Sequence, residues 1–387
     1  MKEVVYLDNN ATTRPAPEVV EAMMPYLTER YGNPSSIYSF GGDVKKEVDK
    51  ARAQVAALLN CSPEEIIFTS CGTESDNMAV RGRLLASKER SAIVTTKVEH
   101  PAILNTCRSL KTHGSRVEEV GVNYDGALDM EQLKGSLLSD VAIASVMWGN
   151  NETGVIFPIA KIAEMVKEKG IVMHTDAVQA VGKVPIDLAK VPVDMLSLSG
   201  HKLHAPKGIG ALFVRKGTKI APYMTGGHQE SNRRGGTENV PYIVGLGKAC
   251  ELAMNEMEGQ VKKISTMRDR LERELLRLCP NTTSNGANSE RLPNTTNISF
   301  QYVEGEAILL LMNELGICAS SGSACTSGSL DPSHVLKAMD IPFTLLHGSI
   351  RFSLSHYNTE EEIDLVIKEL PPIIKRLRDI SPFGRAD

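Results

Sequence analysis

Two alternating hydrophobic patterns constrain the fold of this chain more than any other feature of its sequence. From about residue 40, apolar residues recur at the spacing of an amphipathic helix, and these stretches alternate with short runs that are apolar almost throughout. A strand that is apolar throughout is buried on both faces, and helices between such strands indicate parallel pairing. We therefore predict an α/β fold with a mostly parallel central sheet and helices on both faces. The expected strands lie in residues 65–70, 91–99, 140–149, 170–179, 193–202 and 208–217.

A second, smaller unit is predicted after residue 254, where this alternation ends. Residues 256–278 have the pattern of a long amphipathic helix, and a polar loop, two strands and further helices follow. A chain of 387 residues is long enough for two domains. We expect a large domain at residues 15–255, a small C-terminal α+β domain at residues 256–387, and an N-terminal arm, residues 1–14, that packs with the small domain.

Charge and cysteine content argue against several classes of protein. A formal net charge of -4 offers no basic footprint for nucleic acid or an anionic membrane. The longest apolar run, residues 307–312, is too short to span a bilayer, and the N-terminus has no apolar signal-peptide core. The seven cysteines form no Cys-x-x-Cys pair, which disfavours structural zinc and a disulfide scaffold. We expect a cytoplasmic protein without a metal site.

Polar residues follow the predicted strands at their carboxyl ends, where open α/β sheets bind their ligands. Gly72 and Thr73 open a helix after the strand at residues 65–70, and such a helix N-terminus suits a phosphate group. The alternative is that Thr73 is an ordinary N-cap. His100 follows the strand at residues 91–99, where the sequence is compatible with a structural histidine as well as a functional one.

Two further strand ends carry a carboxylate and an amine. Asp176 closes an apolar run, and because an unpaired buried carboxylate is costly, it needs a partner or serves as a cap. Ser199, His201 and Lys202 close another run, ahead of a turn-like stretch. Lys202 is either a solvated surface amine or an amine that loses its proton readily and acts as a nucleophile.

Taken together, these side chains match the needs of one cofactor, pyridoxal phosphate. It requires a lysine for its Schiff base, a carboxylate for its pyridinium nitrogen and an anion site for its phosphate, and a ring over its face adds binding energy. Each signal alone is weak, but the combination is specific. In that order, the candidates are Lys202, then Asp176, then Gly72 and Thr73 with Ser199, and finally His100.

A cysteine stands in an unusual stretch near the C-terminal end. Residues 320–334 read SSGSACTSGSLDPSH, in which small side chains surround Cys325. Such a segment packs little, so we expect it to move and to belong to the small domain. Cys325 is either an incidental exposed thiol or a nucleophile that must visit two places, a pocket and an acceptor.

Longer blocks carry a resemblance to a known family. The chain resembles the NifS-type cysteine desulfurases of the class V aminotransferase family, which implies the fold type I of pyridoxal phosphate enzymes. Two positions depart from the family pattern: Tyr38 replaces a usual histidine and Gly149 a usual alanine. The matching blocks, which cover nearly the whole chain, are YLDNNATT, GNPSS, TSCGTESDN, VEHPA, MWGNNETG, HTDAVQAVGK, LSLSGHKLHAPKGIGAL, GGHQE, RRGGTEN, SSGSACTSGSLDPSHV, RFSLS and NTEEEID.

The resemblance implies how the cofactor is held. Lys202 would form the Schiff base, Asp176 would pair with the ring nitrogen, and Gln179 would bond the ring oxygen. His100 would stack on the ring and take part in proton transfer. Asn151 would help to hold the cofactor and its bound substrate. The phosphate ligands would be Gly72, Thr73, Ser199, His201 and, reaching over from the neighbouring subunit of a homodimer, Thr237.

The resemblance also implies a reaction and its partners. L-cysteine would become L-alanine, Arg351 would bind the substrate carboxylate, and Cys325 would accept the sulfur as a persulfide. The sulfur would pass to an iron–sulfur scaffold protein, and the C-terminal run DIPFTLLHGSIRFSLS favours the nitrogen-fixation branch. A housekeeping desulfurase, a selenocysteine lyase or a transaminase of the same family are the alternatives, as is a sulfur carrier without catalysis.

Overall fold

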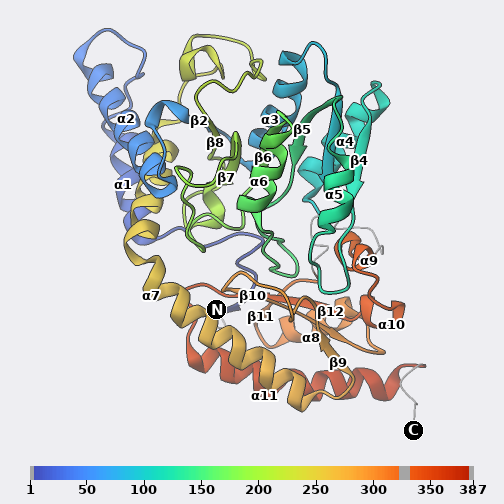
Figure 1. Cartoon of the computed structure of the whole chain (residues 1–387). Coiled ribbons are helices and arrows are strands. Elements are labelled where there is room, and N and C mark those ends of the chain that lie inside the picture. The colour runs from blue at the N-terminus through green and yellow to red at the C-terminus, as the bar shows by residue number, and fades with distance from the viewer. Residues whose placement is uncertain (1–3, 322–331, 383–387) are drawn as a thin grey trace.

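A seven-stranded sheet forms the larger part of the protein in the computed structural model, which describes residues 4–321 and 332–382 (Figure 1). Its strand order is β2-β8-β7-β6-β5-β3-β4, and all neighbours pair in parallel except at β8, which runs antiparallel to both β2 and β7. The prediction of a mostly parallel sheet is confirmed. The strands are β2 (Ile66–Thr69), β3 (Ala92–Thr96), β4 (Val117–Val120), β5 (Val141–Ser145), β6 (Val172–Asp176), β7 (Met195–Ser199) and β8 (Gly210–Val214).

Helices cover both faces of this sheet, because successive side chains of its strands point to opposite sides. Ile67 and Ile93 are buried in one cluster with residues of α3 and α4, whereas Ile66 and Val94 are buried in a second cluster with the remaining helices. Helices α3 (Gly72–Ala86) and α4 (Pro101–Thr112) form the first layer. The second layer contains α1 (Pro17–Thr28), α2 (Ser39–Leu59), α5 (Met130–Ser136), α6 (Ile159–Glu168) and the first half of α7 (Val240–Leu278).

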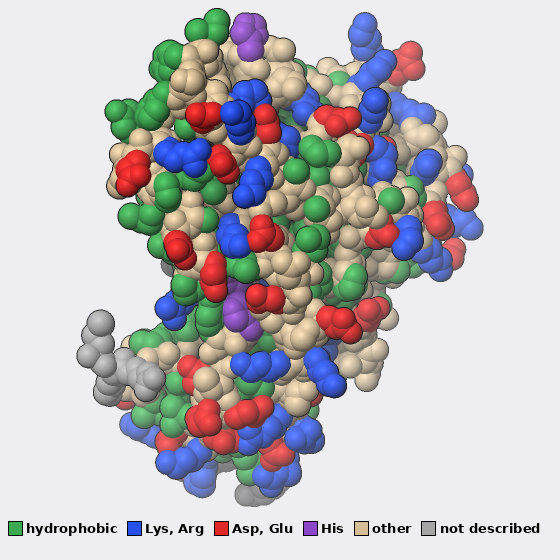
Figure 2. All heavy atoms as spheres, turned by 90° about the vertical axis from the view of Figure 1, so that its left-hand side faces the viewer, with side chains coloured by type: hydrophobic (Ala, Val, Ile, Leu, Met, Phe, Trp, Pro, Cys, Tyr) green, Lys and Arg blue, Asp and Glu red, His purple; other side chains and the backbone are tan. Residues whose placement is uncertain are grey.

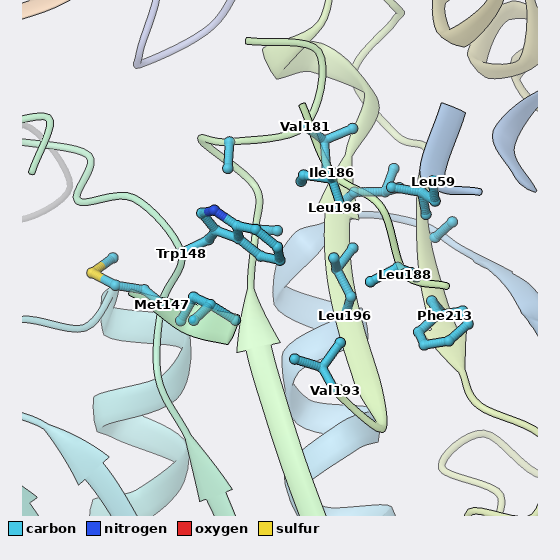
Figure 3. Packing of buried hydrophobic residues seen from close by; sticks show 14 of the residues in the cluster. Leu59, Met147, Trp148, Val181, Ile186, Leu188, Val193, Leu196, Leu198 and Phe213 are labelled. Atoms are coloured by element: carbon cyan, nitrogen blue, oxygen red, sulfur yellow. The ribbon is translucent and has the colours of Figure 1, made fainter. Parts of the chain in front are cut away.

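The second cluster is the main core of the protein. Figure 3 shows Leu196 and Phe213, from neighbouring strands, packed close to Leu188. Trp148 and Met147, which follow β5, close the cluster toward the carboxyl ends of the strands (Figure 3). This packing fixes the strand ends, and the side chains that follow them are thereby held in defined positions.

A smaller sheet with its own core lies beside the second half of α7 (Figure 1). Its buried cluster includes Leu271 of α7 and Phe300 and Phe352 of the sheet. The domain boundary expected near residue 255 falls inside α7. The unit contains the antiparallel strands β12 (Ser349–Ser353), β10 (Thr295–Phe300) and β9 (Thr282–Ser284) with the helices α8 (Gly305–Glu314) and α11 (Glu360–Ile380).

Two segments connect the larger part, built on the seven-stranded sheet, with the smaller part, built on the three-stranded sheet. At the N-terminus, β1 (Val5–Tyr6) pairs in parallel with β11 (Ile317–Cys318), beside the smaller sheet. Near the C-terminus, α9 (His334–Ala338) and α10 (Phe343–Leu346) return to the larger part, where Val335 is buried in the main core. Of these two segments, the N-terminal one continues into Asn10 and Ala11, which line the cavity described below.

The surface carries charges of both signs. On the face shown in Figure 2, Lys and Arg side chains are interspersed with Asp and Glu side chains. Within residues 4–321 and 332–382, no helix combines the length and the hydropathy needed to cross a membrane. The described part of the chain also contains three short 3-10 helices: η1 (Pro63–Glu65), η2 (Gly200–Lys202) and η3 (Gln229–Asn232).

Candidate active site

A cavity of about 270 Å³ opens at the carboxyl ends of β2, β3, β5, β6 and β7. Most site residues predicted from the sequence line it. Thr237 does not; it lies after η3 with an exposed side chain. Cys325 lies outside the described residues. The predicted residues that line the cavity are Gly72, Thr73, His100, Asn151, Asp176, Gln179, Ser199, His201, Lys202 and Arg351.

Hydrogen-bond donors gather at one end of the cavity. Gly72 and Thr73 form the first turn of α3, after the N-cap residue Cys71, whose side chain makes no capping hydrogen bond. Ser199 lies beside Gly72, since a Cβ on Gly72 would be 3.4 Å from Ser199 Cβ, and the buried Ser199 Oγ has no hydrogen-bond partner among the described residues. A side chain on Gly72 would place its Cβ 2.8 Å from Val178 Cγ2, so the backbone closely adjoins this wall. A helix N-terminus with an unpartnered hydroxyl suits a phosphate.

Two buried carboxylates, Asp176 and Asp76, also line the cavity. Asp176 ends β6, and its Oδ1 accepts a hydrogen bond from the Val178 N–H at 2.9 Å. Burial raises the pKa of Asp176 to about 6, although Lys202 opposes this. Asp76 lines the same cavity, and burial together with the charge of Asp176 raises its pKa well above the ordinary value. A ligand with a positively charged N–H would stabilise the ionised form of Asp176.

Lys202 follows β7 on η2 and reaches the N-terminal arm. Its Nζ donates to the carbonyl oxygens of Asn10 at 2.5 Å and Ala11 at 2.8 Å. Gln179 Nε2 donates to the same Asn10 oxygen at 3.0 Å. The arm thus closes the cavity on the side of the amine.

His100 presents a neutral imidazole to the cavity. It is the N-cap of α4, and its Nδ1 accepts a hydrogen bond from the Ala102 N–H at 3.1 Å. Burial, together with the charges of Lys202 and His334, lowers the pKa of His100 to about 4. Since Nδ1 is an acceptor, the proton of the neutral ring lies on Nε2, so His100 offers a donor at neutral pH.

Arg351 enters the cavity from β12, opposite the large sheet. Its Nη2 lies 2.6 Å from Asp8 Oδ1, and its Nη1 donates to the Asn151 carbonyl at 3.0 Å. The Nε atom is buried and has no hydrogen-bond partner among the described residues. A fixed guanidinium with a remaining donor suits a ligand carboxylate.

Four residues in or next to the site were not predicted from the sequence. Asp8 and Asn10 stand in the block YLDNNATT, but nothing local in that block indicates contact with residues far along the chain. Asp76 lies one helical turn after Gly72, so it faces the same cavity. Lys183 lies four residues after Gln179 and donates to its Oε1 at 2.7 Å, a spacing that places both side chains on one face of a helical turn.

Known proteins are similar to this chain in sequence and in fold. Residues 5–366 match the family model for aminotransferase class-V. A cysteine desulfurase of Trichormus azollae is 59% identical over 380 residues, which cover 98% of this chain and 95% of that protein. Cysteine desulfurase NifS of Azotobacter vinelandii is 56% identical, over 98% of this chain and 94% of that protein.

Solved structures agree with this relation. A NifS-like protein has a TM-score of 0.91 and 38% sequence identity, and the match covers 97% of this chain and 100% of that one. The prediction of the fold and of the family is confirmed. The chain belongs to the class V aminotransferase family and, within it, to the NifS-type cysteine desulfurases.

Proposed function

We propose that this protein is a pyridoxal phosphate-dependent enzyme that converts L-cysteine to L-alanine and leaves the sulfur as a persulfide on Cys325. The observation that supports this best is that Lys202, Asp176 and Arg351 line one cavity although they come from distant parts of the chain. The family relation points to the same activity.

The donor groups of the cavity fit the cofactor. Lys202 would hold its aldehyde carbon and Asp176 its ring nitrogen, while Gln179 would face the ring oxygen and His100 the ring. The unpartnered Ser199 Oγ, the α3 N-terminus with Gly72 and Thr73, and His201 would receive the phosphate. When bound, the cofactor supplies an electron sink for charge that develops at the substrate Cα.

The residues of the chain orient the substrate and move its protons. Arg351, fixed by Asp8 and Asn151, would bind the carboxylate of L-cysteine. Lys202 Nζ would take the proton from Cα, and the Nε2–H of His100 would supply a donor near the reacting atoms. The Cys325 thiolate would attack the substrate sulfur, so that a sulfur–sulfur bond forms and the carbon–sulfur bond breaks. The electron pair left on Cβ takes up a proton, and the proton held by Lys202 Nζ returns to Cα, which gives alanine.

The test follows both products. Purified protein loaded with pyridoxal phosphate receives L-cysteine and a reducing thiol, and sulfide and alanine are measured for wild type, Cys325→Ala and the control Cys61→Ala. We expect equal amounts of both products from wild type and the control, and neither from the still-yellow Cys325→Ala. An unimpaired Cys325→Ala would instead favour a selenocysteine lyase type of reaction.

We also propose a cytoplasmic homodimer that passes sulfur to an iron–sulfur scaffold protein, in the nitrogen-fixation branch. The similarity to Azotobacter vinelandii NifS supports this branch over a housekeeping desulfurase. Thr237, exposed in the single chain, would complete the phosphate site of a neighbouring subunit.

Complementation tests this arrangement of Thr237. Thr237→Val and Lys202→Ala proteins are each expected to be inactive or to bind the cofactor weakly. A heterodimer of the two contains one site with both native residues. Because random mixing and refolding of equal amounts makes about half of the dimers heterodimers, roughly a quarter of all sites should regain wild-type cofactor affinity. Two weak parents without recovery would show that Thr237 acts within its own subunit, and a Thr237→Val protein with wild-type cofactor affinity would show that it has no such role.

A further inference from the structure

One residue of the N-terminal arm, Asn10, contacts two side chains of the active site through its backbone carbonyl. This oxygen accepts a hydrogen bond from Lys202 Nζ at 2.5 Å and another from Gln179 Nε2 at 3.0 Å. The next carbonyl along the arm, that of Ala11, accepts from Lys202 Nζ at 2.8 Å. The position of the arm therefore determines where the Lys202 amine is held.

The side-chain amide of Asn10 makes hydrogen bonds with both of its polar atoms. Asn10 is buried, with 2% of its surface exposed. Its Nδ2 donates to the Asn151 carbonyl at 3.1 Å and to Thr295 Oγ1 at 2.8 Å. Its Oδ1 accepts from Asn294 Nδ2 at 3.0 Å and from Lys183 Nζ at 3.4 Å. An amide has two N–H donors and two lone pairs on its oxygen, so its full capacity is used.

These contacts join the two parts of the protein at Asn10. Asn151 and Lys183 follow β5 and β6 of the seven-stranded sheet. Asn294 precedes β10 of the three-stranded sheet, and Thr295 is the first residue of that strand. The orientation of the Asn10 amide is unambiguous, because a carbonyl such as that of Asn151 can only accept. A buried polar network in which each member is satisfied favours a single arrangement, so both parts together fix Asn10.

The two carbonyls of the arm also orient the nitrogen of Lys202. A neutral amine has two hydrogens and one lone pair. When it donates both hydrogens to the carbonyls of Asn10 and Ala11, its lone pair lies on the side of the nitrogen away from the arm. Lys202 lines the active-site cavity, so the direction of this lone pair decides how readily an electrophile bound there is attacked.

We propose that Asn10 is a positioning residue that orients the Lys202 amine for attack on the aldehyde of the cofactor. Its side chain acts indirectly, because it holds in place the backbone carbonyl to which the amine donates. Without the side-chain amide, the arm loses its hydrogen bonds to Asn151 and Thr295, and the Lys202 amine is free to take other orientations. This inference rests on the proposed function, since it requires an aldehyde that reacts with Lys202.

The experiment separates bond formation from binding. Apoenzyme is mixed with increasing concentrations of pyridoxal phosphate, and stopped-flow absorption of the Schiff base gives the limiting rate constant for bond formation in the bound complex. Calorimetry measures the affinity for pyridoxine 5′-phosphate, which has the ring and the phosphate but no aldehyde. For Asn10→Ala we expect the limiting rate constant to fall about tenfold or more, because orientation is lost, while the affinity for pyridoxine 5′-phosphate stays within about twofold of wild type.

A merely structural role of Asn10 would give a different result. General loosening of the cavity would weaken the binding of pyridoxine 5′-phosphate as much as it slows bond formation. A limiting rate constant near the wild-type value, or a fall matched by an equal loss of affinity for pyridoxine 5′-phosphate, overturns the proposal.

The adjacent Asn9 provides a matched control. It is buried as well, and its Nδ2 donates to the carbonyls of Tyr6 and Ser353. Asn9→Ala therefore removes a buried amide from the same arm but leaves the side-chain contacts of Asn10 in place. Both the limiting rate constant and the affinity for pyridoxine 5′-phosphate should remain near wild type in this variant.

A milder variant replaces Asn10→Ala if that protein does not fold. Thr295→Val keeps the shape of the side chain but removes the acceptor for one N–H of Asn10. We expect it to slow bond formation severalfold at unchanged affinity for pyridoxine 5′-phosphate. A wild-type limiting rate constant in Thr295→Val would show that the Asn10 amide does not act on Lys202.

The two proposals fail in different ways. If wild type forms the Schiff base and Asn10→Ala forms it equally fast, only the inference about Asn10 fails. If wild-type protein forms no Schiff base with pyridoxal phosphate, the proposed function fails. Reductive methylation of the apoenzyme with formaldehyde and cyanoborohydride then still decides whether Asn10 holds the amine. Mass spectrometry should show severalfold faster methylation of Lys202 in Asn10→Ala, relative to the exposed Lys190, and an unchanged ratio overturns the inference.

Discussion

The carboxylate of Asp8 lies 2.6 Å from the guanidinium of Arg351, so the N-terminal arm holds the side chain proposed to bind the substrate. Both side chains are largely buried, with 17% and 4% of their surface exposed. We predict that Asp8→Asn raises the KM for L-cysteine about fivefold to tenfold with a smaller change in kcat. Without this partner, the Arg351 side chain is mobile in the free enzyme. Substrate binding must then immobilise it, which costs about 1 kcal/mol of binding free energy. Steady-state kinetics would measure this.

The control for this variant is Asp49→Asn, which removes an exposed carboxylate paired with Lys45 on α2 and should leave KM unchanged. A lower KM in Asp8→Asn would contradict the prediction, since it would mean that Asp8 competes with the substrate carboxylate for Arg351.

The buried carboxyl of Glu99 should cause the apoenzyme to lose stability as the pH rises from about 4.5 to about 8. Its side chain is fully buried, with one oxygen bonded to Thr96 Oγ1 and the Met147 N–H and the other without a partner among the described residues. Burial raises its pKa to about 8. Between the ordinary pKa near 4.5 and 8, the folded state keeps a proton that the unfolded chain releases, so stability falls as pH rises through this range.

We therefore predict that Glu99→Gln, which cannot ionise, stabilises the apoenzyme at pH 8 by on the order of 2 to 4 kcal/mol. The gain should shrink toward zero as the pH falls to about 4.5. Urea denaturation at several pH values measures this difference, with the exposed Glu89→Gln as control. A gain that does not depend on pH would show that Glu99 is not the titrating group.

Two glycines of α7 should respond oppositely to the same substitution. A Cβ on Gly247 would lie 2.6 Å from Ala51 Cα of α2, whereas a Cβ on Gly259 would meet nothing within 4 Å. We predict that Gly247→Ala destabilises the protein by about 1 to 3 kcal/mol through overpacking. Gly259→Ala should stabilise it by about 0.5 to 1 kcal/mol, because alanine favours the helix. Thermal unfolding of both variants tests this, and equal effects would contradict it.

The hydrophobic pattern predicted most of the large sheet, and its failures have physical reasons. β4 was missed because it reads Val-Glu-Glu-Val and lies half-exposed at the sheet edge, so it lacks an apolar run. The antiparallel direction of β8 could not be seen, since a buried strand has the same pattern in either direction. The predicted start of the long helix near residue 256 was wrong: α7 begins at Val240, where glycines that allow close packing against α2 interrupt the helical pattern.

The candidate site was predictable where residues follow a strand directly. Thr73, His100, Asp176 and Lys202 were recognised because their places at strand ends follow from local pattern alone. Asp8 was missed because it reaches the site through pairing with Ser353, and such long-range contacts leave no local signal. The roles of Thr237 and Cys325 rest on the family resemblance and stay predictions.

The position of the N-terminal arm has a consequence for the newly made protein. The Asn10 N–H donates to Ser353 Oγ, and 343 positions of sequence separate the two residues. On the ribosome, the arm emerges among the first residues, but its partner in β12 emerges near the end of synthesis. Lys202 therefore lacks its carbonyl acceptors in their final place until almost the whole chain has been translated. Cofactor loading should accordingly be a post-translational event, and fragments that end before β12 should remain colourless.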